Sequence, residues 1–259
     1  MQIIYSSDNQ YLKAARKLKQ RKYREQESRF LMEGRVPIAE LMGRQPERIA
    51  MLFITEDQSE WLKGLAPNTI PVLILDEKNL SGLCETETPQ GVVAVVHKPL
   101  YDFASTTAAA DLLLYIEALN DPGNLGSILR SASAMGVDAV LLSPGCVDAY
   151  SAKVIRSSMG GVLNLPIIEY VNSDHLQQLQ NQGWHLIGSS PSAARPYYGA
   201  DLTGKAIIIL GNEASGMSTA ITSLCNESLN IPIKSEVNSL NVAAACAIIL
   251  AESFRQRNQ

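Results

Sequence analysis

Three polar segments in the second half of the sequence carry residue types that could bind an anion or a small polar ligand. The first, NDPGNLGSILR at residues 120–130, has Pro122 and Gly123 just after an apolar run. This pattern predicts a tight turn that opens into a helix, whose first backbone N–H groups can hold an anion. Arg130 lies further along that helix and could bind a phosphate in a bidentate manner. Without other evidence, an ordinary surface arginine on a helix is a better interpretation of Arg130 than a phosphate ligand.

The second segment, LGNEASGMS at residues 210–218, places Gly211 and Gly216 on either side of one carboxylate, Glu213. Two glycines at this spacing are similar to a phosphate-binding loop, but Met217 stands where that loop requires Lys. No GxGxxG follows any apolar run, so the fingerprint of dinucleotide binding is also missing. The segment therefore predicts either a glycine loop that wraps a small ligand or an ordinary strand-to-helix turn.

The third segment, residues 231–245, sets polar side chains between apolar stretches. Asn238 or Ser239 could cap the Ala-rich helix that we expect at 239–254. Capping does not by itself explain why Asn238, Ser239 and Asn241 are clustered, so these side chains are candidate site residues.

Basic residues are concentrated near the N-terminus. Lys and Arg make up seven of the 12 residues at 13–24, namely Lys13, Arg16, Lys17, Lys19, Arg21, Lys22 and Arg24. On a chain of net charge −4, this cluster indicates a phosphate-bearing partner. A solvated helix face that binds nothing is an equally good interpretation of the charges alone.

The composition is that of a globular protein with a sizeable core, because 46% of its 259 residues are hydrophobic and 19% are charged. Its four cysteines lack CxxC spacing and its three histidines lack metal-ligand spacing. This argues against a disulfide scaffold or a metal centre and favours a reducing cytosol. The first residues contain no apolar signal region, and no apolar run reaches the roughly 18 residues of a membrane span. We therefore expect a cytoplasmic location.

The elements that must position these residues divide the chain in two. The first part predicts a small α/β unit with helices at 6–26 and 35–42 and strands at 30–34, 49–55, 72–75 and 92–96. Residues 98–110 lack clear periodicity and are expected to form a linker. The following part has continuous apolar runs at 112–116, 139–143, 165–170, 184–188, 206–210 and 229–233.

Such runs, each bounded by turn residues, are typical of parallel strands buried on both faces. We therefore expect an α/β fold whose second domain is a sheet of about six strands with helices on both sides. Ligands of open parallel sheets bind beyond the carboxyl ends of the strands. All three polar segments are expected at that edge.

The three polar segments also contain three short motifs in a fixed order. N-x-G-x-x-x-R is present as Asn124, Gly126 and Arg130, G-x-E as Gly211, Asn212 and Glu213, and S-L-N as Ser239, Leu240 and Asn241. In this order they resemble the SpoU/TrmH family of RNA ribose 2′-O-methyltransferases, within the SPOUT superfamily. KVIRSSMGG at 153–161 resembles the R-x-S-x-G stretch of that family, and residues 17–34 resemble its L30e-like substrate-binding domain.

This resemblance covers nearly the whole chain and implies a specific organisation. Residues 1–97 would be an RNA substrate-binding domain, 98–110 a linker, and 111–259 a SPOUT methyltransferase domain with a deep trefoil knot. The resemblance further implies a homodimer with its active site near the subunit interface, S-adenosylmethionine as cofactor, no metal, and structured RNA as substrate, with ribosomal RNA favoured.

The resemblance also assigns site residues. It implies that the catalytic residues are Arg130, Asn124, Glu213, Ser239 and Asn241. It implies that the cofactor is bound by Gly188, Ser189, Leu210, Gly211, Asn212, Gly216, Ile231, Pro232, Ser239 and Leu240. RNA would be bound by the seven basic residues at 13–24 together with Arg156 and Ser158. Because a guanidinium stays protonated, we expect Arg130 to stabilise the developing alkoxide rather than to accept its proton. Glu213 is expected to hold the loops by accepting N–H bonds.

Two other functions fit the same motifs. The chain could methylate the ribose of transfer RNA, or it could be a knotted module that binds RNA without catalysing a reaction. Titration with S-adenosylmethionine distinguishes the module from an enzyme, and the basic N-terminal segment disfavours a protein methyltransferase.

Overall fold

The computed structural model describes residues 2–4, 6–65 and 69–259. By their internal contacts these residues form two compact units. The first comprises the chain up to Leu100 together with Tyr150–Arg156, and the second comprises Tyr101–Ala149 and Ser157–Gln259. We describe each unit by itself.

The segment Tyr150–Arg156 belongs to the first unit, although the sequence placed it in the second domain. The reason is the Tyr150 side chain, which is 2% exposed. Its ring lies 5.1 Å from the ring of Phe30, and Lys98 Nζ lies 4.6 Å from its centroid. No periodic pattern in the sequence reveals this long-range packing.

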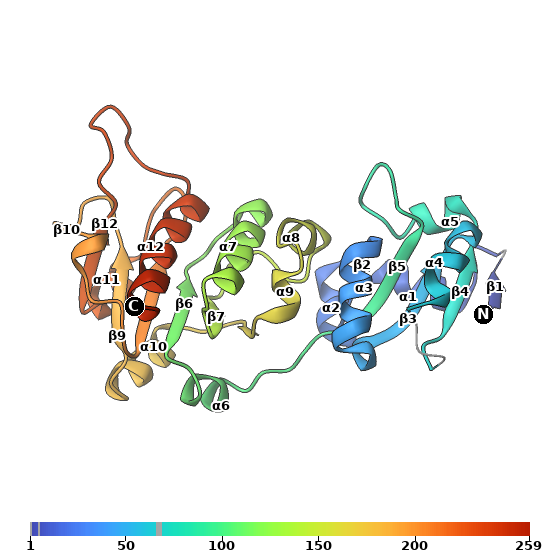
Figure 1. Cartoon of the computed structure of the whole chain (residues 1–259), viewed down its shortest axis with the longest axis horizontal. Helices are drawn as coiled ribbons and strands as arrows, with labels where there is room; N and C mark the ends of the chain where they lie inside the picture. Colours follow the sequence, from blue (N-terminus) through green and yellow to red (C-terminus); the bar gives the residue numbers. More distant parts are fainter. Residues whose placement is uncertain (1, 5, 66–68) are drawn as a thin grey trace. The chain divides into compact units, whose positions relative to one another are not determined.

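The first unit contains a five-stranded mixed sheet (Figure 1). Its strand order is β1 (Gln2–Ile4), β4 (Val72–Leu75), β3 (Ile49–Ile54), β5 (Val92–His97) and β2 (Arg29–Glu33). The pairs β1–β4 and β4–β3 are parallel, whereas β5 runs antiparallel to β3 and β2. Its helices are α1 (Gln10–Lys17), α2 (Arg21–Glu27), α3 (Arg35–Arg44), α4 (Ser59–Lys63) and α5 (Glu77–Ser81), with 3-10 turns at Pro46–Arg48 and Glu56–Gln58.

The prediction of a single helix over 6–26 is wrong, because the helix is interrupted between α1 and α2. The side chain of Arg24 folds back and donates from Nη1 to the carbonyl oxygens of Leu18 and Lys19, both at 2.8 Å. These bonds satisfy carbonyls that a continuous helix would have paired with backbone N–H groups. The start is also later than expected, since Asn9 caps α1.

The second unit contains a seven-stranded sheet in which every pairing is parallel. Its strand order is β10 (Arg195–Pro196), β12 (Glu227–Asn230), β9 (His185–Ser189), β11 (Ala206–Leu210), β6 (Leu112–Ile116), β7 (Ala139–Leu142) and β8 (Ile167–Ile168). The expected parallel sheet is therefore confirmed. Each expected run overlaps a strand, and β10 was too short to detect.

Helices cover both faces of this sheet. They are α6 (Phe103–Ala108), α7 (Pro122–Ala134), α9 (Gly161–Asn164), α10 (Ser173–Asn181), α11 (Thr219–Leu224) and α12 (Val242–Arg257), with a 3-10 turn at Tyr197–Gly199; α8 (Ala152–Ser157) precedes α9. Residues Leu113 and Tyr115 of β6 share a core cluster with Leu176 of α10 and Ile221 of α11. Because side chains alternate along a strand, the neighbouring residues of β6 face the opposite side, where α7 and α12 lie side by side (Figure 1).

Two expectations for helices need correction. Residues 103–108, expected within a linker, form α6, because Asp102 caps the helix and Phe103 packs against the core of the sheet. The last helix begins at Val242 rather than at 239, and its cap is Asn241 instead of Asn238 or Ser239.

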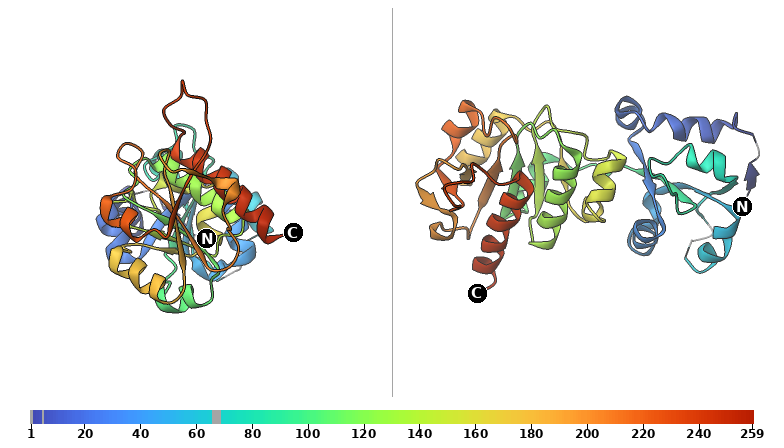
Figure 2. Two further views of the ribbon diagram at one scale, coloured as in Figure 1. Left: turned by 90° about the vertical axis from the view of Figure 1, so that its left-hand side faces the viewer. Right: turned by 90° about the horizontal axis from the view of Figure 1, so that it is seen from above.

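The loops that follow β9, β11 and β6 leave the same edge of the sheet, because these strands are parallel neighbours. The segment 231–241, between β12 and α12, extends from that sheet as a long loop (Figures 1 and 2). All three polar segments of the sequence are therefore found at one end of the second unit.

Candidate active site

A pocket of about 730 Å³ opens at the carboxyl edge of the seven-stranded sheet. Its walls come mainly from 189–193 at the end of β9, 210–217 at the end of β11, and 239–242 at the start of α12, and they also include Asn124 and Ile231. Its volume lies within the roughly 300–1,000 Å³ of pockets for cofactor-sized ligands. The lining combines hydroxyl and amide side chains with apolar ones such as Leu210 and Val242.

A chain of hydrogen bonds joins the three sequence motifs. Glu213 Oε1 accepts from Asn124 Nδ2 at 3.2 Å and from the backbone N–H of Asp121 at 3.2 Å. Asn241 Nδ2 donates to Asn124 Oδ1 at 2.9 Å. Asn124 therefore uses both ends of its amide to connect two loops that lie 89 and 117 residues away. The three residues lie together as the motifs predicted.

Local caps hold two of these residues in place. Asp121 begins α7, and its Oδ1 accepts the backbone N–H of Asn124 at 2.7 Å, followed by Pro122 in the first helical turn. Asn241 caps α12 by accepting the backbone N–H groups of Ala243 at 2.9 Å and Ala244 at 3.3 Å. Its Oδ1 is thus fixed by the helix, and its Nδ2 is directed to Asn124.

The loop after β11 closes tightly on itself. Asn212 and Gly216 exchange two backbone hydrogen bonds of 3.0 and 2.9 Å, and Gly216 has a φ of +68°. A Cβ on Gly211 would lie 2.2 Å from the backbone of Gly216, so only glycine fits there. Asn212 Nδ2 also donates to the carbonyl of Ala118 at 2.7 Å, which ties this loop to the end of β6.

The electrostatics of Glu213 suit a hydrogen-bond acceptor. Partial burial raises its pKa, but hydrogen bonds from backbone N–H groups and from Asn124 outweigh this effect, so the pKa lies below its ordinary value. Glu213 is therefore ionised at neutral pH, as an acceptor of several N–H bonds should be.

Arg130 stands apart from this network. It is exposed, it does not line the pocket, and within the described part of the chain its guanidinium has no hydrogen-bond or ion-pair partner. Six residues at about 100° per residue turn it away from Asn124, onto the face of α7 that it shares with exposed Ser127 and Ala134. Its backbone is fixed by close packing, since a Cβ on Gly161 of α9 would lie 2.9 Å from the carbonyl of Leu129 and 3.1 Å from Arg130 Cα.

Most of the residues predicted to bind a cofactor line the pocket, namely Ser189, Leu210, Gly211, Asn212, Gly216, Ile231, Ser239 and Leu240. Gly188 and Pro232 do not line it. A Cβ on Gly188 would lie 2.7 Å from Met217 Cε, so this glycine makes room for the Met217 side chain, which itself lines the pocket. Sequence reasoning missed residues 190–193 after β9, although their run of small and polar residues was a usable signal.

The predicted RNA-binding residues separate into two groups. Arg24 and Ser158 are buried at 7% and 0% exposure, so their assignment as RNA contacts is wrong. Arg16 donates to Asn79 Oδ1, and Lys19 donates to the carbonyls of Gly82 and Cys84.

The remaining basic residues are exposed except Arg21, which is partly buried, and Lys19 is exposed as well. Lys13 is exposed and pairs with Asp8, Arg21 pairs with Glu25, and Lys17 and Lys22 lie near the ring of Tyr23. Arg156 is exposed and lies 3.9 Å from Glu33.

Two general features of the chain bear on ligands. Among the described residues, no group of three His, Cys, Asp or Glu side chains is arranged to hold a metal ion. The helices in the described part of the chain are all too short or too polar to cross a membrane.

Comparison with known proteins adds a family to this geometry. Residues 111–251 match the SpoU rRNA Methylase family, and residues 9–94 match the MRM3-like substrate binding domain. The chain is 32% identical over 250 residues to 23S rRNA (guanosine(2553)-2′-O)-methyltransferase RlmP of Bacillus subtilis, covering 96% of this chain and 98% of that protein. It is 31% identical to 23S rRNA (guanosine-2′-O-)-methyltransferase RlmB of Neisseria meningitidis, covering 83% and 91%.

Solved structures show the same similarity. The SpoU methyltransferase AviRb from Streptomyces viridochromogenes, in complex with AdoMet, superposes with a TM-score of 0.85 at 27% identity. The match covers 97% of this chain and 99% of that one.

Proposed function

The chain belongs to the SpoU rRNA methylase family, and on this premise we propose that it transfers a methyl group from S-adenosylmethionine to a ribose 2′-hydroxyl of ribosomal RNA. The observation that carries the proposal is the hydrogen-bonded chain from Glu213 through Asn124 to Asn241, which closes one side of the pocket. The named relatives methylate 23S rRNA at ribose 2′-oxygens. This favours ribosomal over transfer RNA.

The pocket fits S-adenosylmethionine in size and in chemistry. Tight loops at Gly211 and Gly216 bring backbone N–H and C=O groups to its surface, and Leu210 and Leu240 supply apolar walls. Residues 189–193, 210–217 and 239–242 would hold the cofactor. When bound, it supplies the activated methyl group.

The residues of this chain would bind the cofactor, orient the substrate and stabilise the negative charge that develops during the reaction. Asn124 and Glu213 keep the loops at a fixed separation, which holds the reacting groups in line. The Arg130 guanidinium has no partner among the described residues, so its N–H donors are available to an RNA phosphate or to the negative charge that develops on the 2′-oxygen. Ser239, at the pocket wall, would orient the substrate.

The exposed position of Arg130, outside the pocket wall, supports a homodimer with the site near the interface. We propose that a second copy of the chain completes the site on that side. Sedimentation equilibrium should then give twice the 28.2 kDa of one chain. A monomer with full methyltransferase activity would contradict this.

We also propose that the second unit contains a deep trefoil knot. Its support is the strand order, in which β12 pairs with β9 and β11 pairs with β6 although the members of each pair are far apart along the chain, and the convergence of three distant loops on one pocket. An experimental structure whose backbone leaves no knot when it is pulled from both ends would contradict this proposal.

For the first unit, we propose an L30e-like fold that contacts RNA through exposed cations such as Lys17 and Lys22. Since ribosomal RNA is the proposed substrate, we place the enzyme in the cytoplasm.

The experiment combines two measurements on the purified chain. Calorimetric titration with S-adenosylmethionine should show one site per chain, and transfer of labelled methyl should mark ribosomal RNA fragments but not transfer RNA. Absence of cofactor binding would favour an RNA-binding module without activity, and labelled transfer RNA would favour the transfer-RNA enzyme. Mapping 2′-O-methylation in cells that lack the protein would then identify the nucleotide.

A further inference from the structure

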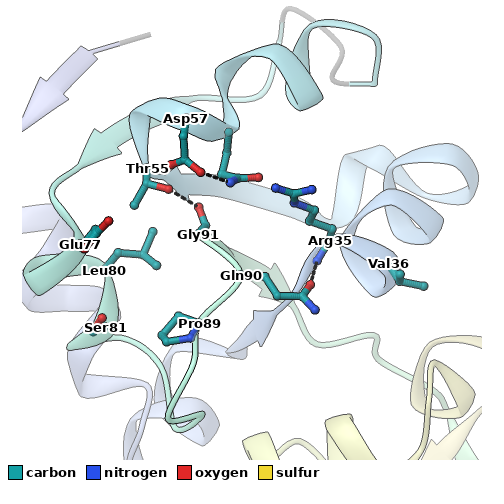
Figure 3. A pocket seen from close by; sticks show the side chains of 11 residues that line it. Arg35, Val36, Thr55, Asp57, Glu77, Leu80, Ser81, Pro89, Gln90 and Gly91 are labelled. Atoms are coloured by element: carbon teal, nitrogen blue, oxygen red, sulfur yellow. Dashed lines mark hydrogen bonds between the residues drawn. The ribbon is translucent and has the colours of Figure 1, made fainter.

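A second pocket, of about 640 Å³, lies entirely within the first unit. It is bounded by the start of α3, the 3-10 turn after β3, helix α5 and the turn that leads into β5 (Figure 3). We propose that this pocket binds an unpaired guanine base of the RNA substrate. The inference rests on the proposed function for its substrate class.

The first observation is a buried polar atom without a partner. Gln58 lines the pocket and is 3% exposed. Its Nε2 donates to the carboxylate of Asp57, which fixes the orientation of the amide. Its Oε1 therefore points the other way, and no hydrogen-bond donor for it exists among the described residues. A buried acceptor of this kind costs free energy unless a ligand supplies an N–H.

The second observation is the space next to that amide. Gly91 has a φ of +75°, and a Cβ there would lie 2.8 Å from Gln58 Cγ. Only glycine leaves this side of the pocket free. Gln90 is also fixed, because its Oε1 accepts the backbone N–H of Arg35 at 2.9 Å at the uncapped start of α3 (Figure 3).

The charges of the pocket select a ligand with donors. Its wall contains two carboxylates, Asp57 and Glu77, and one cation, Arg35. The hydrogen bond from Thr55, helped by Gln58 and by the positive charge of Arg35, keeps the pKa of Asp57 below its ordinary value. Asp57 is thus an ionised acceptor. With acceptors in excess, the pocket disfavours a phosphate or another anion.

Guanine matches this arrangement. Its N1–H and N2–H₂ groups are adjacent donors, suited to Asp57 and to Gln58 Oε1, and its O6 and N7 acceptors are suited to an arginine. Figure 3 shows the Arg35 side chain lying across the pocket on the side of Asp57, and within the described residues its guanidinium has no acceptor. Pro89 and Leu80 provide apolar surface for the faces of the base. Uracil has one ring donor and cannot satisfy both acceptors.

The RNA substrate is the source that the structure favours. Val36 on the rim is 73% exposed, so the pocket is accessible to a base held on a larger molecule. All the lining residues fall within 9–94, the stretch that matches a substrate binding domain. Proteins that read RNA sequence take unpaired bases and hydrogen-bond their edges.

The test uses the full chain and three single-stranded RNA pentanucleotides, UUGUU, UUIUU with inosine, and UUUUU. We expect UUGUU to shift the NMR signals of the Gln58 side-chain amide and the Gly91 backbone N–H, and to bind about tenfold tighter than UUUUU. Inosine lacks the 2-amino group and should bind with intermediate affinity. Equal affinities for the three RNAs, or no shift at Gln58 and Gly91, would overturn the proposal.

Two variants connect the pocket to specific atoms. Asp57→Asn should weaken binding of UUGUU about tenfold, whereas Asp102→Asn, the same change at the cap of α6 in the other unit, should have no effect. Gln58→Met removes the unpaired acceptor, so it should retain or raise the melting temperature while it weakens UUGUU binding. Unchanged UUGUU binding in both pocket variants would overturn the proposal.

Methyl transfer provides the second measurement. Asp57→Asn should raise the KM for RNA while kcat and cofactor affinity stay unchanged. If UUGUU binds at Gln58 but the KM is unaffected, the guanine is not part of the substrate and the inference fails. If the chain transfers no methyl group although the pocket selects UUGUU, the proposed activity fails and the guanine site stands.

Discussion

Replacing Asn124 with aspartate tests whether the hydrogen-bonded chain holds the pocket together. The two side chains have nearly the same shape, but Asn124→Asp would place a second carboxylate where Asn124 Nδ2 now lies, 3.2 Å from Glu213 Oε1. At that distance two unit charges repel by about 1.3 kcal/mol in water. The lost hydrogen bond adds about 1 kcal/mol. Together the two effects amount to roughly 2 kcal/mol, which corresponds to a factor of about 30 in affinity. Because the loops can open to relieve this strain, we expect cofactor affinity to fall by this factor.

The effect of Asn124→Asp should depend on pH with a definite sign. In the native chain, the lowered pKa of Glu213 keeps it ionised, so its contribution is present above its unfolded pKa and is lost only as pH falls through the lower folded value. In the variant, repulsion raises the pKa of one of the two carboxyl groups. The loss of cofactor affinity in the variant is therefore greatest at pH 8. It decreases as the pH falls toward about 5, because that carboxyl group then takes up a proton.

Calorimetric titration with S-adenosylmethionine at pH 8 and pH 5.5 measures this directly. Asn172→Asp is the matched control, because Asn172 caps α10 in the same unit, away from the pocket wall. It should leave the dissociation constant unchanged. If Asn124→Asp binds the cofactor as well as the native chain at pH 8, the network does not shape the pocket and our reasoning about it is wrong.

Three further predictions address other parts of the chain. Gly161→Ala should lower the melting temperature and turnover together, because the added Cβ lies 2.9 Å from the carbonyl of Leu129 and displaces α7; an unchanged melting curve would remove this packing argument. Arg130→Lys should keep cofactor affinity in calorimetry but lose most turnover, and near-normal turnover would end its assignment. RNA affinity should fall steeply as salt increases while cofactor affinity stays constant, and equal salt slopes in filter binding would contradict the separate roles of the two units.

The sequence predicted the elements whose signals are local. Continuous apolar runs such as 206–210 indicated buried parallel strands, and the structure has β11 at these residues. The convergence of Asn124, Glu213 and Asn241 followed from the expected parallel sheet, whose carboxyl edge carries all three segments, and from the order of the three motifs.

What the sequence could not predict depends on long-range contacts. The break between α1 and α2 depends on where the Arg24 side chain folds, and the position of Tyr150 depends on Phe30, which lies far away along the chain. The same holds for the guanine pocket, because Gln58, Gly91 and Arg35 meet only after the five-stranded sheet has formed.

The assignment of Tyr150–Arg156 to the first unit limits how this protein can be divided. A truncation that starts at residue 101 would remove Phe30 and Lys98 and so uncover an aromatic ring that is 2% exposed in the intact chain. Expressed alone, the C-terminal fragment should therefore be prone to aggregation through this ring. Recombination between relatives would meet the same obstacle, since grafting a foreign N-terminal module requires replacing the Tyr150–Arg156 segment along with it.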